Sequence, residues 1–246
     1  MTDWVDLERE LEAWGRAGQN ATLWWRDDDA ITATPTLRHL LDLAAAGQPV
    51  PLALAVIPMA ADATLAQSLE NADHVVALQH GYAHANHAAE ASKKAEFPVG
   101  RESSTALQDL QRGSQRLREL FGDRALPVLV PPWNRIDEAL LPSLAGLGFT
   151  TLSLFGPAEP RPIKCLNTHV DLLAWRGERK GKEHTALVAE IVAQLTARLD
   201  SGSREPIGLL SHHLVHDETA WSFLQGLFET MAEPPACRWL SARDLM

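Results

Sequence analysis

The chain has 246 residues, a length typical of a single α/β barrel domain, and its 46% hydrophobic content is enough to fill a sizeable core. The net charge of −10 and the lack of a dense Lys/Arg run argue against nucleic acid or an anionic membrane as a partner. The two cysteines give no disulfide framework, and the charged N-terminus lacks the apolar core of a signal peptide, so we expect a cytoplasmic protein. The longest apolar stretch, residues 50–57, is too short to cross a bilayer.

Apolar runs alternate with helix-period segments along the whole chain. A first helix is predicted at residues 3–17, where large apolar side chains recur three and four positions apart, and we expect it to pack outside the barrel. Strands are predicted at residues 22–25, 52–57, 75–78, 128–130, 150–154, 169–173 and 207–210. Further helices are predicted at residues 36–46, 61–69, 104–121, 137–147, 184–199 and 218–231. About seven βα units without a long linker indicate an α/β protein with one domain, residues 1–246, folded as a distorted (β/α)7-type barrel.

Polar residues follow several predicted strands at the point where each strand ends. Three aspartates follow the first strand, a histidine cluster the third, a proline loop the fourth and a histidine pair the seventh. In a parallel α/β fold the carboxyl ends of the strands lie on one face of the domain. The topology therefore predicts that these four segments converge on one site.

The aspartates Asp27, Asp28 and Asp29 are the first candidate site residues. Adjacent carboxylates repel one another and are desolvated at the end of a buried strand, so a fold keeps them where a cation or catalysis offsets the cost. We interpret one as a metal ligand and its neighbour as a general base, with Arg26 placed to lower their pKa values or to hold the base. The alternative is a solvated turn in which Asp28 or Asp29 caps the next helix.

His80 and His84 form the second candidate group. Two histidines four positions apart share one face of a helical turn. With a carboxylate from another element they make a three-ligand metal set that leaves one position open for water or substrate. Neutral imidazoles suit zinc best, and cobalt, manganese or nickel fit the same donors. We therefore expect a divalent metal cofactor, zinc above all.

The loop at residues 130–135 follows the fourth strand and is made rigid by two prolines. Such a loop can aim a backbone N–H and a side chain into the site. Trp133 offers a flat apolar surface suited to the face of a sugar, and Arg135 can orient the catalytic aspartate.

The last two strands supply the remaining candidates. His212 and His213 would point to opposite faces of a strand, so one of them faces the site and can act as general acid on a leaving amine. Asp171 is positioned to tune that histidine, and Trp175 to wall the pocket. The alternatives are histidines satisfied in the core and an ordinary strand with a core tryptophan.

In this order, the segments resemble the polysaccharide deacetylase family with the NodB-homology fold. That family carries an Asp-Asp-Gly motif, a His-x-x-x-His motif, an Arg-Pro-Pro-Tyr-like loop, an Asp/Trp motif and a Leu-x-His motif. The resemblance covers roughly residues 21–217, and Ala30 and Trp133 replace the family's Gly and Tyr. The counterparts here are residues 26–30, residues 80–84, residues 130–135, Asp171 with Trp175, and residues 210–212.

The resemblance implies metal-dependent removal of an N- or O-acyl group by a metal-bound water. Matching the aspartates to the family's Asp-Asp-Gly makes Asp28 the base and Asp29 the ligand that joins His80 and His84. The shifted register gives the two roles to Asp27 and Asp28 instead.

The resemblance also implies the rest of the machinery. A backbone N–H near Trp133 would stabilise the oxyanion, and a histidine, for which His212 matches the motif, would protonate the amine. We therefore expect a metal-dependent deacetylase acting on an N-acetylated sugar, with a small-molecule or saccharide substrate as its partner and an oligomeric state that the residues leave open. The alternatives are an amidase or imidase with a non-sugar substrate, and a non-catalytic carbohydrate-binding or regulatory protein on the same fold.

Overall fold

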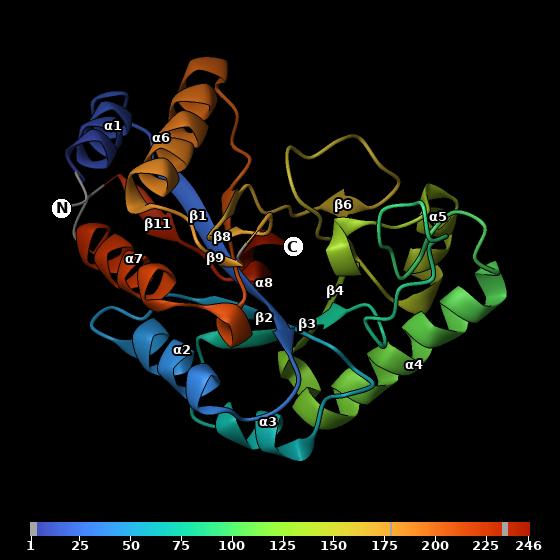
Figure 1. Cartoon of the computed structure of the whole chain (residues 1–246). Helices are drawn as coiled ribbons and strands as arrows, with labels where there is room; N and C mark the ends of the chain where they lie inside the picture. The colour runs from blue at the N-terminus through green and yellow to red at the C-terminus, as the bar shows by residue number, and fades with distance from the viewer. Residues whose placement is uncertain (1–3, 178, 233–235) are drawn as a thin grey trace.

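The computed structural model describes residues 4–177, 179–232 and 236–246 of the chain. One sheet forms its centre, with strands in the order β6-β5-β4-β3-β2-β1-β10-β7, and helices lie around it (Figure 1). Every neighbouring pair in this order is parallel, so the carboxyl ends of the strands face the same way. The strands are β1 (Ala21–Ala30), β2 (Leu52–Val56), β3 (Val75–His80), β4 (Ala125–Val130), β5 (Thr151–Leu152), β6 (Lys164–Cys165), β7 (Val170–Asp171) and β10 (Ile207–Ser211).

The two ends of this sheet are joined by one stretch of chain. Strands β6 and β7 stand at opposite ends of the strand order, yet both belong to residues 164–171. The N–H groups of Leu166 and Thr168 donate to the carbonyls of β5 and of the residues just beyond it, whereas the N–H of His169 donates to Gly208 in β10. The sheet thus curls back on itself, which confirms the predicted single-domain α/β fold and its distorted barrel.

Several helices begin or end at capping residues. Thr34 caps α2 and Pro35 occupies its first position, while Asp62 caps α3 and Glu102 caps α4. A left-handed Gly202 ends α6. The helices are α1 (Val5–Arg16), α2 (Pro35–Ala45), α3 (Ala63–Ser68), α4 (Ser103–Phe121), α6 (His184–Ser201), α7 (Glu218–Thr230) and the short α8 (Ala242–Leu245).

The segment predicted as one helix at residues 137–147 is instead three short pieces. A 3-10 turn (Glu138–Leu140) precedes α5 (Leu141–Leu144), and another 3-10 turn (Ala145–Leu147) follows it. Pro142 lies inside this segment, where it provides no N–H for the helix and its ring crowds the preceding turn. The prediction of a continuous helix was therefore wrong.

Helix α1 packs on the outside of the domain beside α6 (Figure 1). Its apolar stripe, Leu7, Leu11 and Trp14, is buried, and each leucine withdrawn from water contributes about 1.5–3 kcal/mol. The first residue of the helix predicted at residues 3–17 lies outside the described residues. Among the helices of the described residues, none has both the length and the apolar character needed to span a membrane.

Strand β1 is longer than predicted, because it continues through the charged residues Arg26 to Asp29. These buried charges have polar partners: Arg26 pairs with Asp28, Asp27 with His213, and Asp29 with His80 and His84. Strand β6 was not predicted, and neither were two further features. Strand β11 (Cys237–Trp239) pairs in parallel with the start of β1, and β8 (Leu173–Ala174) and β9 (Lys180–Gly181) form an antiparallel hairpin.

Candidate metal centre and active site

The end of β1 departs from regular strand geometry at Asp29. A strand alternates its side chains, which would send Asp28 and Asp29 to opposite faces. Asp29 adopts a left-handed conformation with φ 72°, and the register between β1 and β2 shifts between Asp27 and Ala30. Aspartate tolerates this conformation better than most residues do. The irregularity brings the Asp29 carboxylate to the same site as Asp28.

Asp29, His80 and His84 form a compact group of candidate metal-ligating atoms. The Nε2 atoms of His80 and His84 lie 3.2 Å and 3.3 Å from the same Asp29 oxygen, Oδ1. One candidate ligand atom from each residue lies within 4.8 Å of the others. The Asp29 Oδ1 is buried and has no hydrogen-bond partner among the described residues. An unpaired carboxylate oxygen facing two imidazole nitrogens suits a divalent cation.

The hydrogen bonding of His80 fixes which nitrogen it offers. Its Nδ1 lies 2.9 Å from the carbonyl oxygen of Val130, so Nδ1 carries a proton, and in the neutral ring Nε2 keeps its lone pair. Burial opposes ionisation of Asp29, but the contact with His80 and the other histidines hold the pKa of Asp29 below its ordinary value. Burial and the neighbouring His80 lower the pKa of His84. The carboxylate and the neutral imidazole are the forms that bind metal.

The spacing of four suggested that the histidine pair lies on a helical turn, but it does not. His80 is the last residue of β3, and His84 lies in the irregular loop that follows, with φ 54°. The left-handed Gly81 turns the chain so that both imidazoles reach Asp29. The grouping expected from the sequence is therefore reached through a different backbone conformation.

Asp28 is held by a fully buried arginine from its own strand. Arg26 Nε lies 2.8 Å from Oδ1 of Asp28, and Arg26 Nη2 donates to Oδ2 at 3.1 Å. The same guanidinium donates to Ser153 Oγ at 2.7 Å and to Asn134 Oδ1 at 2.9 Å. Arg26 and Asp28 are two positions apart on a strand and so share the inner face. These contacts orient one carboxylate toward the site.

Arg135 does not hold Asp28, the proposed base, so the prediction that it orients this aspartate was wrong. Its side chain is exposed, and its Nη1 donates to the backbone carbonyl of Lys94 at 2.9 Å. The two residues before it, Trp133 and Asn134, are left-handed with φ 57° and 55°. After this turn the Arg135 side chain points away from the site. Arg26 fills the orienting position instead, a role that the sequence had also allowed.

His212 faces the site and His213 does not. Nε2 of His212 lies 4.0 Å from Oδ2 of Asp28, and its Nδ1 is buried without a hydrogen-bond partner among the described residues. His213 turns the other way, where its Nδ1 meets Oδ1 of Asp27 at 2.5 Å. The two neighbours thus point to opposite sides, as expected for residues at the end of a strand.

Asp27 belongs to a buried structural network rather than to the metal-ligating group. Its Oδ2 accepts hydrogen bonds from the Ser211 hydroxyl and from the backbone N–H of His213. Burial opposes ionisation, but the His213 imidazolium holds the pKa of Asp27 low, and Asp27 in turn raises the pKa of His213. This arrangement favours the register in which Asp28 and Asp29 face the site.

Asp171 reaches the site indirectly. Its Oδ2 accepts a hydrogen bond from Trp175 Nε1 at 2.7 Å, and its Oδ1 accepts one from the N–H of Leu173. The Trp175 ring stands edge-on to the His212 ring, with centroids 4.6 Å apart. Burial raises the pKa of Asp171, against the opposing charge of His212. Trp175 is 43% exposed, so it forms part of the wall of the site rather than of the core.

Trp133 contacts the candidate metal centre directly. Its ring lies 4.4 Å from the His84 ring, centroid to centroid. Its left-handed backbone is unusual for a bulky residue, and backbone strain of this kind is concentrated at functional sites. Asp29, His84, Trp133 and Asn134 are the four non-glycine residues with positive φ in the described chain, and all four lie at this site.

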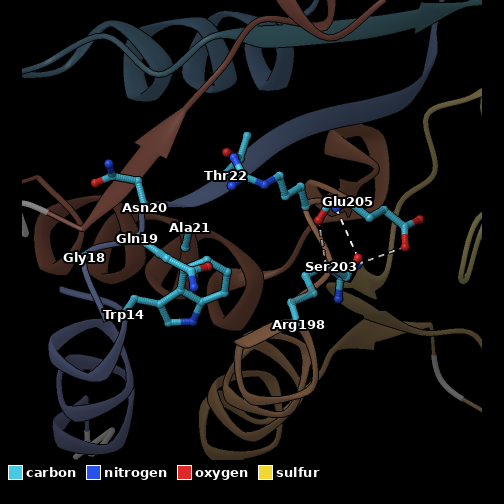
Figure 2. Close-up of a pocket in the computed structure, with 10 residues that line it drawn as sticks. Trp14, Gly18, Gln19, Asn20, Ala21, Thr22, Arg198, Ser203 and Glu205 are labelled. Atoms are coloured by element: carbon cyan, nitrogen blue, oxygen red, sulfur yellow. Dashed lines mark hydrogen bonds and ion pairs between the residues drawn. The ribbon is translucent and has the colours of Figure 1, made fainter. Parts of the chain in front are cut away.

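A separate cavity of about 280 Å³ opens at the opposite end of β1 (Figure 2). Ala21 and Thr22, at the start of the strand, line it together with Trp14, whereas Asp29 lies at the other end of the same strand. The buried Arg198 in the lining of this cavity already has a partner, because its Nε donates to the backbone carbonyl of Glu205. This cavity therefore does not belong to the candidate active site.

Comparison with known proteins identifies the fold. No protein-family model matches the sequence, and no curated protein matches it. Solved structures do match over most of the chain. A candidate polysaccharide deacetylase from Mycobacterium smegmatis superposes with a TM-score of 0.69 at 17% identity, covering 93% of this chain and 89% of that one. The chain has the polysaccharide deacetylase fold.

Two further structures with the polysaccharide deacetylase fold support this assignment. A family 4 acetyl xylan esterase from Clostridium thermocellum, solved with a cobalt ion, has a TM-score of 0.56 at 11% identity and covers 91% of this chain and 89% of its own. A polysaccharide deacetylase from Bacillus cereus has a TM-score of 0.53 at 16% identity and covers 91% and 92%. At these identities the likeness establishes the fold.

Sequence reasoning missed three polar residues that support the site. Asn134 and Ser153 hold the guanidinium of Arg26, and Glu96 is buried next to the loop that carries His84. Asn134 lies within the proline loop, so its segment had been identified. Ser153 and Glu96 had no signal in the sequence, because their roles depend on contacts that only the folded chain makes.

Proposed function

We propose that this protein is a metal-dependent hydrolase that removes an acetyl group from an N-acetylated sugar. The observation that carries the proposal is the group formed by Asp29, His80 and His84. Asp28 and His212 lie beside this group, with Oδ2 of Asp28 4.0 Å from Nε2 of His212. The polysaccharide deacetylase fold supports it, because the structural neighbours named above are described as esterases or deacetylases. The proposed cofactor is a divalent cation, with zinc the first choice for two imidazoles and one carboxylate.

Two residues of the chain are the proposed carriers of the protons in acyl transfer. A bound divalent cation would supply Lewis-acid activation of water and of the acyl carbonyl. Asp28, held in place by Arg26, is the proposed base that takes the proton of the attacking water. His212, whose Nε2 lies 4.0 Å from Oδ2 of Asp28, is the proposed acid that gives a proton to the leaving nitrogen.

Two tryptophans give the site its proposed preference for a sugar. Trp133 packs on His84 and Trp175 packs on His212, so an aromatic ring lies beside each histidine. Flat indole faces suit the apolar face of a pyranose ring. The Trp175 ring is also tied by its hydrogen bond to Asp171, which fixes its direction. We propose that Asp171 acts through Trp175 to shape the pocket and, by its charge, to tune His212.

The test combines metal content with hydrolysis of a substrate panel. Purified wild-type protein and the His80→Ala and Asp28→Asn variants would be assayed for divalent metal and for amine release from N-acetylated sugars. We expect His80→Ala to lose the metal, and Asp28→Asn to keep it while losing about 10²–10⁴-fold in kcat. The exposed His87, in the same loop, provides a matched control, because His87→Ala removes an imidazole outside the cluster.

Each outcome separates the proposal from its alternatives. Hydrolysis of small cyclic or linear amides, without release from acetylated sugars, would replace the sugar substrate by a non-sugar amide. A wild-type protein that binds no divalent metal, even after incubation with zinc, would contradict the hydrolase mechanism. It would leave a carbohydrate-binding or regulatory role.

A further inference from the structure

Glu96 is a buried carboxylate with an unusual set of partners. Its side chain is fully buried, in the loop between β3 and α4. One oxygen, Oε2, accepts a hydrogen bond from the N–H of Tyr82 at 3.1 Å, and the other, Oε1, accepts one from the N–H of Ala83 at 2.7 Å. Within the described residues, Glu96 has no ion pair with a lysine, arginine or histidine. Two consecutive backbone amides thus hold its charge.

The two amides belong to the short loop between the candidate metal ligands His80 and His84. Left-handed residues bracket this loop, with φ 58° at Gly81 and 54° at His84. Successive N–H groups that follow a left-handed residue point to one side of the backbone and form a small anion-binding concavity. Glu96 occupies this concavity, so the chain itself supplies the anion that the loop conformation requires.

The packing at Gly81 shows how closely the carboxylate fits. A Cβ atom at position 81 would lie 1.9 Å from Oε2 of Glu96 and 2.6 Å from Cδ of Pro132. No side chain fits there while the carboxylate is in place. The loop conformation, the glycine and the carboxylate therefore form one unit.

We propose that Glu96 is a positioning residue of the metal centre, which holds the 81–84 loop so that Nε2 of His84 faces Asp29. This inference rests on the proposed function and deepens it. His80 and His84 differ in how they are anchored. His80 is part of β3, and its Nδ1 is held by the carbonyl of Val130, so it does not need Glu96. His84 lies in the irregular loop, where its Nε2 faces Asp29 and its ring packs against the rings of His80 and Trp133.

Loss of Glu96 should therefore act on metal binding through His84. The variant Glu96→Gln keeps the shape but places an NH2 group against one backbone N–H, so one hydrogen bond becomes a repulsive contact. The loop then spends less time in the conformation that binds metal, and the apparent affinity falls by that fraction. We expect the Kd for Zn²⁺ to rise about 10- to 100-fold, the usual effect of removing a group that orients a metal ligand.

The experiment is a competition titration with Zn²⁺ and a chromophoric chelator on the whole purified chain. The variants are Glu96→Gln, His84→Ala and the double variant. The control is Glu90→Gln, an exposed carboxylate in the same loop, which should bind Zn²⁺ like the wild type. If Glu96 acts through His84, the double variant should bind no more weakly than His84→Ala alone. Glu96→Asp, which keeps the charge but shortens the side chain, should also bind more weakly and replaces Glu96→Gln if that variant fails to fold.

The outcomes distinguish this inference from the proposed function. A wild-type protein that does not bind Zn²⁺ contradicts the proposed function and the inference together. A wild type that binds Zn²⁺, with unchanged affinity in folded Glu96→Gln and Glu96→Asp, contradicts the inference alone. Additive losses in the double variant also contradict it, because they would show that Glu96 acts independently of His84. A fall in the thermal stability of the metal-free variant, without a change in the Kd of the folded protein, would make Glu96 merely structural.

Discussion

Replacing Arg26 with methionine should destabilise the fold by leaving the carboxylate of Asp28 buried without its cation. Arg26 is completely buried, and the Asp28 side chain is only 4% exposed. Methionine fills a similar length but restores none of the hydrogen bonds to Asp28, Ser153 and Asn134. Removing one partner of a buried ion pair costs about 3–5 kcal/mol, so we expect a loss of unfolding free energy of that size.

A double-mutant cycle separates the charge pair from the other contacts. In Arg26→Met/Asp28→Asn neither charge remains, so the loss should fall short of the sum of the single variants by about 2–3 kcal/mol. The measurement is urea unfolding at pH 7 with EDTA present, which keeps metal binding out of the comparison. The exposed pair Arg9 and Asp6, 2.8 Å apart, provides the control, with an expected coupling below about 0.5 kcal/mol.

Additivity at positions 26 and 28 would refute this reasoning. Losses of the single variants that sum to the loss of the double variant would mean that the two side chains do not stabilise each other. Arg26 would then be held by Ser153 and Asn134 alone, and Asp28 would need another source of orientation.

Three further predictions concern groups away from the metal-ligating atoms. Burial and the charge of Arg198 lower the pKa of His169 to about 4 from its ordinary 6.5, so the unfolded chain binds the proton more readily and stability falls as the pH drops from 6.5 towards 4. The loss of unfolding free energy over this range is about 3 kcal/mol. His169→Asn should flatten this part of a plot of unfolding free energy against pH, and an equally steep plot for the variant would contradict the prediction. Burial raises the pKa of Cys237 to about 12, so its thiol should resist alkylation by iodoacetamide at pH 8 until urea unfolds the chain; rapid modification of the native protein would show otherwise. Trp175→Phe removes a hydrogen bond that favours the ionised Asp171, so a carboxyl carbon NMR titration should show its pKa rising, and an unchanged or lower value would rule out this contact.

The sequence predicted the features that follow from local pattern and parallel topology. The apolar runs located β1, β2, β3, β4 and β10, and the helix signals located α2 and α6. The polar residues at the ends of those strands were expected to converge, and Asp29, His80 and His84 lie together in the structure. These predictions succeeded because strand ends of a parallel sheet share one face whatever the details of the loops.

The features that could not be predicted depend on backbone conformation or on distant contacts. The register of the three aspartates was open, because it is set by the left-handed Asp29 and by the pairing of Asp27 with His213. Arg135 was a reasonable candidate to hold the proposed base. Two left-handed residues come before it, and its side chain points away from the site and donates to the carbonyl of Lys94. Strand β6 and β11 are two or three residues long and pair with distant segments, so they carry no periodic signal.

The left-handed residues at the candidate active site have a consequence for protein engineering. Asp29, His84, Trp133 and Asn134 each adopt a conformation that glycine would adopt at lower free energy. Substitution by glycine at Trp133, the bulkiest of the four, should therefore relieve strain while removing an indole that is proposed to contact the substrate. A selection for heat resistance would favour substitutions in the segments that are proposed to carry the activity. Stability and activity are thus opposed at these positions, and a stabilised variant should be sought in the helices, well away from the end of β1.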